Sequence, residues 1–464
     1  MLKTCNTPNR VYLIFTILLM NTLITQTIII SESEQIRLED SVRDALKSSL
    51  EYLRSNVDED GLALGYGEND ILKATARLGV LAGYIHLGLS DDESLIILKK
   101  IANVLTKLSD NLEDKINDRN ERILVEQALI EFAVIHYGLT GLENSKNILL
   151  RSCRYLEENI GWSPPTACPT YLIYSTYISY IAGGKINRND VKASLEEIKQ
   201  EYIEFVNYTA WGGRNLAYGL EILSLGLRSA SLSNVNPPVE VVALWEVHLN
   251  HTLQYVEQAS EQLTTDEAEA FLSSLVSALE APYPTKLKAE AINVSEELAG
   301  KLLENWMVGG RLIMQNRYSL SYLMYDPTLN YSELLTLLNK FPRIKVYDLN
   351  LPLILERLSK IDEVENRDKY RELSSSAVAI VSSSKPYFKV ISEEIMPKQD
   401  IVDYIVSTSF LATWYSFQKL RAAPPTELTS LFSGPSYVTL ISCSILLLAL
   451  LIMYRLGKLI KEEE

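Results

Sequence analysis

Apolar residues recur every three to four positions through most of residues 36–326, the spacing that places them on one face of an α-helix. Two kinds of segment alternate along this stretch. One kind carries many charges, as in 92–109, and the other contains long apolar runs, such as Leu78–Leu89 and Ile130–Tyr137. The alternation predicts helical hairpins, each with a polar outer helix and an apolar inner helix.

The turn that follows the apolar helix is repeated in the sequence. Ile85-His86-Leu87-Gly88-Leu89-Ser90 and Ile135-His136-Tyr137-Gly138-Leu139-Thr140 match closely, and weaker copies begin at Ile178 and Leu223. A turn that recurs at a nearly regular interval along the chain indicates a repeat architecture. The predicted hairpins are 36–56 with 70–87, 92–109 with 120–137, 143–158 with 169–182, 189–206 with 213–229, 238–262 with 266–280, and 295–306 with 310–325.

The order Ala45, Tyr52-Leu53, Asp60-Gly61, Thr75-Ala76, Leu81 and Gly88 resembles the repeat of the α/α toroids. That group includes terpenoid cyclases, protein prenyltransferase β subunits and several polysaccharide-active families. The resemblance implies an all-α fold in which residues 31–326 form an (α/α)6 toroid-like body. An open solenoid of helical hairpins has a similar period and is the alternative.

The catalytic motifs of the group are missing from this sequence. There is no Asp-x-Asp-Asp motif of the cyclases and no Gly-Cys-Gly-Glu-Gln stretch of the thioester-forming members. Zinc-dependent prenyltransferases use an Asp, a Cys and a His, but neither Cys153 nor Cys168 has a histidine near it in the sequence. The resemblance therefore implies the fold without these three activities.

The helical rhythm breaks after residue 326. We expect a mainly helical extension over 327–421, in which β-prone runs around a Ser-Ser-Lys-Pro turn predict either a β-hairpin at 377–392 or further helices. Residues 422–436 are rich in Pro, Ser and Thr, a composition typical of an exposed stalk.

Two apolar segments predict a place in the cell membrane. Residues 11–30 follow Lys3 and Arg10 and precede an acidic stretch, so 1–30 is expected to be a signal peptide or a retained signal anchor. Residues 437–454 contain no charge and run into Arg455, Lys458 and Lys461. This basic bias predicts a transmembrane helix at 437–454, a cytoplasmic tail at 455–464 and an extracellular body, in a single-pass or double-pass protein.

Composition and charge narrow the class of protein. The chain has 464 residues, of which 47% are hydrophobic, which is enough to bury a core. Its 44 basic and 59 acidic side chains give a net charge of −15, which argues against a nucleic-acid partner. Cys153 and Cys168 lie in the extracellular body and predict either a disulfide, worth about 3 kcal/mol, or two unpaired buried thiols.

If the body is a toroid, the loops that enter the inner helices surround the mouth of its cavity. These loops and helix starts hold acidic and aromatic side chains that could bind a sugar: Asp60, Tyr66, Glu68, Asp70, Trp162, Trp211, Arg214 and Tyr218. A glycosidase would need two of the acids to flank a cleft. The alternative is structural, with rings filling the interior and acids capping helices, as Asp70 would before Ile71.

A second polar group lies on one predicted helix. His248 and His251 share a face with Tyr255, which could serve a polysaccharide lyase, although a solvated helix face explains them equally. No third ligand accompanies the histidines, so no metal is predicted, and no cofactor motif occurs. His86 and His136 occupy equivalent positions near helix ends, where we expect a cation facing the negative pole of the helix.

The tyrosines are the last chemical feature. Tyr171, Tyr174, Tyr177 and Tyr180 follow one another at intervals of three, which indicates either a tyrosine-lined groove or a helical core stripe. The sequence therefore favours a membrane-anchored cell-surface domain that binds a protein or an envelope glycan without catalysis. The alternatives are an extracellular glycoside hydrolase or polysaccharide lyase, and an accessory subunit of a membrane complex.

Overall fold

The computed structural model describes residues 36–109, 112, 116, 118–161, 167–184, 186–201, 213–308, 350–383 and 400–422. The chain divides into two units, 1–416 and 417–464, and almost all described residues belong to the first. Within the described residues the secondary structure is helical, apart from one antiparallel bridge between Val57 and Ala63. The predicted all-α fold is confirmed.

The described helices match the predicted helix positions closely, but the predicted pairing is wrong. Each apolar helix packs mainly on the polar helix that follows it in the chain, and only weakly on the one before it. The polar members are a helix at 36–56, α3 (Asp92–Ser109), α6 (Glu143–Ile160), α8 (Arg188–Gln200), α11 (Val239–Ala259) and α13 (Lys288–Val308). The apolar members are α2 (Glu68–Leu89), α5 (Arg119–Thr140), α7 (Cys168–Ile181), α10 (Gly213–Leu232) and α12 (Thr265–Glu280). Further along the chain are α15 (Asn350–Leu358), α16 (Arg367–Ser383) and α18 (Asp400–Ala422).

Local side chains fix where several helices begin and end. Thr264 and Glu267 form a reciprocal capping box at the start of α12. Asp118 accepts a hydrogen bond from the backbone N–H of Glu121 at 2.9 Å and so caps α5. At the other end of α5, Gly141 adopts a φ of +67° and its N–H donates to Tyr137 O.

The apolar helices are buried almost all round, whereas the polar helices bury one face. Helix α5 buries nearly every side chain from Val125 to Tyr137. Its contact with α2 is close because the neighbouring positions on α2 lack a side chain. A Cβ atom at Gly79 would lie 2.4 Å from Phe132 Cδ2, and one at Gly83 would lie 2.2 Å from Ile135 Cγ2.

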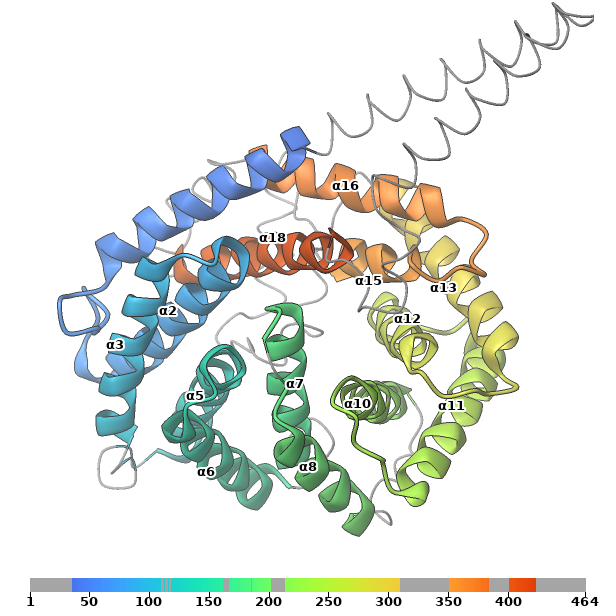
Figure 1. Cartoon of the computed structure of the whole chain (residues 1–464), viewed down its shortest axis with the longest axis horizontal. Helices are drawn as coiled ribbons and strands as arrows, with labels where there is room; N and C mark the ends of the chain where they lie inside the picture. Colours follow the sequence, from blue (N-terminus) through green and yellow to red (C-terminus); the bar gives the residue numbers. More distant parts are fainter. Residues whose placement is uncertain are drawn as a thin grey trace, which may run out of the picture. The chain divides into compact units, whose positions relative to one another are not determined.

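The helices pack in two layers. The apolar helices contact one another in chain order, α2 with α5, then α7, α10, α12 and finally α15. Figure 1 shows α6, α8, α11 and α13 as a second layer on the outer side of α5, α7, α10 and α12. This arrangement explains why most charged residues lie on one kind of helix, since the outer layer has a whole face in water.

The part of α18 that belongs to the first unit contacts the first hairpin. Thr408 Oγ1 lies 2.8 Å from Ser49 Oγ, and the rings of Tyr404 and Tyr52 stack with their centroids 3.9 Å apart. Arg43 Nε also donates to Tyr415 Oη at 2.6 Å. The extension that the sequence predicts at 327–421 therefore packs, through this part of α18, on the helix at 36–56.

The β-hairpin expected at 377–392 is wrong in its first half, because residues up to 383 belong to α16. Ala377, Val378 and Val381 are buried at helical spacing, so packing on one face outweighs the strand preference of the β-branched side chains. The remainder of the predicted hairpin lies outside the described residues.

Cys153 and Cys168 form the predicted disulfide, with their Cα atoms 5.5 Å apart. It joins Cys153 in the middle part of α6 to Cys168, the first residue of α7. The bond therefore ties the start of an apolar helix to the side of the preceding polar helix.

Several expected segments lie outside the described residues: the signal segment at 1–30, the second helix of the sixth hairpin at 310–325, the stalk beyond 422, and 437–464. Among the residues that the structure does describe, α5 is the helix long and apolar enough to cross a membrane. Two-thirds of its apolar window is buried within the protein, as in the core helix of a water-exposed domain.

Candidate functional site

The apolar helix α10 carries one narrow polar stripe. Arg214, Glu221 and Arg228 are seven residues apart, which is about two helical turns, so they lie on one side of the helix. All three are partly exposed, whereas the residues between Glu221 and Arg228 are buried. This side of α10 therefore does not face the apolar core, although the rest of the helix does.

Helix α7 carries a comparable stripe of aromatic residues. Tyr174, Tyr177 and Tyr180 are partly exposed, whereas Tyr171 is buried. The ring centroids of Tyr177 and Tyr180 are 6.5 Å apart. The sequence left two alternatives for these tyrosines, a core stripe and an exposed groove. Tyr171 belongs to the core, and the three tyrosines after it are partly exposed.

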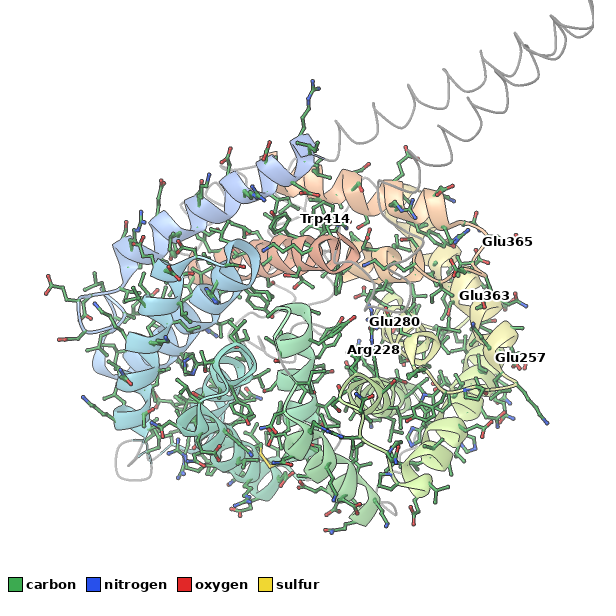
Figure 2. All side chains as sticks on the ribbon, in the orientation of Figure 1. Arg228, Glu257, Glu280, Glu363, Glu365 and Trp414 are labelled. Carbon is green, nitrogen blue, oxygen red and sulfur yellow. A yellow bond between two sulfur atoms is a disulfide. The ribbon has the colours of Figure 1, made fainter. Side chains whose placement is uncertain are left out.

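These stripes meet at Glu280, the last residue of α12. Glu280 Oε2 accepts hydrogen bonds from Arg357 Nη2 at 2.8 Å and Arg357 Nε at 3.2 Å, and a third from Arg228 Nη1. Figure 2 shows Arg228 and Glu280 on the sides of α10 and α12 that face away from α11 and α13. We define the arginine cluster as Tyr177, Tyr180, Glu221, Arg228, Glu280 and Arg357.

The arginine cluster is mostly shielded from water. The side chains of Arg228, Glu280 and Arg357 are 20%, 12% and 11% exposed. Burial alone would raise the pKa of Glu280, but the charges of Arg357 and Arg228 outweigh it and hold that pKa below its ordinary value. The carboxylate therefore stays ionised and ties the two guanidinium groups together.

The remaining members differ in charge and position. Glu221 accepts a hydrogen bond from Ser273 Oγ at 3.0 Å, and burial raises its pKa against the opposing effect of Arg357. Arg228 Cζ lies 5.4 Å from the ring centroid of Tyr180 and 6.0 Å from that of Tyr177, within cation–π range. The cluster thus combines two guanidinium groups and two carboxyl groups with two partly exposed rings.

Buried titratable groups also occur between α2 and α5. Glu131 is 5% exposed, and burial raises its pKa to about 8, with Arg77 opposing the rise. Burial, helped by the charge of Lys99, lowers the pKa of His136 to about 4. The expectation of a cation at His136 is therefore wrong, because the ring is neutral near pH 7 and pairs through Nδ1 with Ser145 Oγ.

A cavity of about 200 Å³ lies near the end of α5 and is lined by Tyr137, Ser175, Asn187, Asp190 and their neighbours. Its polar groups already have partners within the protein. Lys146 Nζ donates to Asp190 Oδ1 at 2.7 Å, and Tyr137 Oη donates to the other oxygen of this carboxylate. Ser175 Oγ donates to Val134 O at 3.1 Å. These groups stabilise the fold and offer a ligand little.

Among the loop candidates, two acids form local contacts. The backbone N–H of Asp60 donates to Asp58 Oδ1 at 3.0 Å, and Asp70 pairs with Lys73 at 3.1 Å. The expectation that Asp70 caps α2 is wrong, because α2 begins at Glu68 and Gly67 occupies the N-cap position. Tyr66 is partly exposed, as is Arg214, and Tyr218 is buried in α10. Trp162, Trp211 and the side chain of Glu68 lie outside the described residues.

The polar face expected on α11 is only partly exposed. His248 is fully buried, and a Cβ atom at Gly219 would lie 2.6 Å from its Cε1. The expectation that His248 lies on a solvated helix face is therefore wrong, because its ring fills the space next to Gly219 on α10. His251 and Tyr255 are partly exposed, and the Tyr255 ring lies 5.4 Å from that of Phe271.

Among the described residues, no three or more His, Cys, Asp or Glu side chains converge on a point where they could hold an ion. No protein-family model, curated protein or solved structure matches the chain. The candidate site therefore follows from the described side chains alone. Among them, the arginine cluster is the strongest candidate for a ligand-binding site.

Proposed function

We propose that the protein is a cell-surface domain, anchored by its C-terminal segment, whose helix pairs close into an α/α toroid that binds an envelope glycan without catalysis. In this proposal the stripes of α7 and α10 face a shared interior. A transmembrane helix at 437–454 anchors the chain with its body outside the cell, as the charge bias of the sequence indicates.

Closure of the toroid is supported by the contacts of α18. The inner helices follow one another from α2 to α15, and α18 contacts both the helix at 36–56 and α2. An open solenoid would leave the first and last helices without such contacts. With α18 packed on the first hairpin, the inner sides of all these helices would surround one space.

Glycan binding is supported chiefly by the partly exposed rings of Tyr177 and Tyr180 beside Arg228. A sugar ring has apolar faces that pack on aromatic rings, and its hydroxyl groups accept hydrogen bonds from guanidinium groups. Tyr177 also packs against the hydrophobic core, whereas Tyr171 is buried altogether. Tyr180 is therefore the ring that we expect to contribute most to a carbohydrate contact.

The test uses the full chain in detergent and glycan fractions from a cell envelope. Tyr180→Ala is expected to weaken retention on the glycan about tenfold, since one stacking surface is lost. Tyr155→Ala is the matched control, because Tyr155 also lies under an arginine, Arg122 at 4.0 Å, but on the outer helix α6. Equal retention of both variants, or retention on envelope proteins alone, would contradict the proposal.

A second candidate function follows from Glu221. Its raised pKa favours the protonated carboxyl that a general acid needs in glycoside hydrolysis. The chain would then release reducing ends from an envelope polysaccharide, and Glu221→Gln would abolish the release while binding persists. An unchanged polymer after prolonged incubation with the parent chain would exclude this alternative.

A further inference from the structure

The hydrogen bonds of the arginine cluster leave one guanidinium only partly used. Arg357 donates from Nε and Nη2 to Glu280 and from Nη2 to Ser277 Oγ at 2.8 Å. Arg228 donates to Glu280 through Nη1. Among the described residues, nothing accepts from Nε or Nη2 of Arg228. One edge of a planar fork is therefore available to an acceptor from outside the protein.

The cluster joins two guanidinium groups to two carboxyl groups. The charges of Arg357 and Arg228 hold the pKa of Glu280 below its ordinary value, whereas burial raises the pKa of Glu221. Lys360, whose charge also lowers the pKa of Glu280, pairs with Glu356 at 3.8 Å. Because the open edge belongs to a cation, a ligand that carries a negative charge is favoured there.

The tyrosines define what can approach that free edge. Tyr177 and Tyr180 hold Arg228 within 6.0 Å of both ring centroids, so its position is fixed before a ligand arrives. A guanidinium fork binds a planar carboxylate with two parallel hydrogen bonds. The partner best matched to a fork beside aromatic rings is a ring-shaped molecule that carries a carboxylate.

We propose that the free edge of Arg228 binds the carboxylate of an acidic sugar, with Tyr177 and Tyr180 against the sugar ring. This inference rests on the proposed glycan-binding function and specifies the class of glycan that is bound, a polymer of uronic acids. Glu280 and Arg357 act as positioning residues that hold Arg228 in place.

The experiment titrates the full chain in detergent with tri-galacturonate and, separately, with its methyl ester. Tri-galacturonate is expected to bind, and the ester, which lacks the charge, at least about tenfold more weakly. Arg228→Gln should remove this preference, whereas Arg228→Lys should retain part of it because the charge remains and the fork is lost. The matched control is Arg54→Gln, which breaks an exposed pair with Glu93 on the outer layer.

Folding of the variants is checked by their helical circular dichroism and urea midpoint. Arg228→Gln leaves the pair between Arg357 and Glu280 intact, so a folded variant is expected. Equal affinity for the ester and the acid would overturn the inference. Arg228-dependent binding of inorganic phosphate or poly-glutamate as tight as that of tri-galacturonate would also overturn it, because the sugar would then contribute nothing.

The two proposals fail in different ways. If tri-galacturonate does not bind but envelope glycan is still retained in a manner that depends on Tyr180, the acidic-sugar inference is wrong and the glycan function stands. If neither the acid, the ester nor the envelope glycan binds, both are wrong.

Discussion

Replacing Glu280 with glutamine tests the energetic role of the arginine cluster. The substitution keeps the size of the side chain but removes the charge that accepts three hydrogen bonds from Arg228 and Arg357. Two positive groups, 20% and 11% exposed, would then lose the carboxylate that pairs with both of them. Removing one partner of a buried pair costs about 3–5 kcal/mol, and the residual exposure here places the expected loss near 3 kcal/mol.

The loss would be measured as the free energy of unfolding in urea at pH 7, followed by circular dichroism. Glu363→Gln is the matched control, because Glu363 forms an ion pair with Lys288 at 2.6 Å in which both side chains are about half exposed. Solvent screens that pair, so the urea midpoint of the control should stay close to that of the parent.

The pH dependence gives a second check on Glu280. Its pKa is lowered in the folded chain, so its stabilising contribution is complete above its ordinary pKa of 4.5 and is lost as the pH falls through the folded value. The difference between parent and Glu280→Gln should therefore shrink in acid. A difference below about 1 kcal/mol at pH 7, or one that does not change in acid, would refute the reasoning.

Two further predictions concern other parts of the body. The double variant Cys153→Ser, Cys168→Ser should unfold at lower urea concentration, with a loss of about 3 kcal/mol, and an unchanged midpoint after reduction of the parent would contradict the role given to this bond. Glu131 has a pKa raised to about 8, so between pH 4.5 and pH 8 the folded chain holds a proton that the unfolded chain releases, and stability falls as the pH rises. Glu131→Gln should therefore gain stability relative to the parent from pH 5 to pH 8, and a parallel pH profile of the two chains would disprove it.

The helices could be predicted from the sequence because their signals are local. The difference between α3, which buries one face, and α5, which is buried almost all round, is written in the spacing of apolar residues. The disulfide was one of two outcomes expected for Cys153 and Cys168, because their separation of 15 residues allows a small ring and the body was expected to lie outside the cell. The β-prone run at 377–382 wrongly predicted a strand. Its structure is decided by burial against neighbouring helices, which the sequence does not show.

The candidate site could be predicted only in part. Arg214 and the tyrosines of α7 were sequence candidates, whereas Glu221 and Arg228 were missed although they follow Arg214 at seven-residue intervals. The meeting point of the stripes could not be predicted, because Arg357 lies 77 residues from Glu280 and comes from the segment expected to be an extension. Loop acids such as Asp70 drew attention by residue type alone, which says nothing about the distance between side chains.

In the proposed fold the inner helices close into a ring around one interior. The double variant Ser49→Cys, Thr408→Cys tests it directly, because the two hydroxyl oxygens are 2.8 Å apart although the residues are 359 positions apart. After mild oxidation and digestion, mass spectrometry should find a peptide pair linked through positions 49 and 408, and the control Ser49→Cys, Ser277→Cys should give none. Cysteines that stay reduced at 49 and 408, or that link only between molecules, would show that the first and last helices do not meet and would contradict the account.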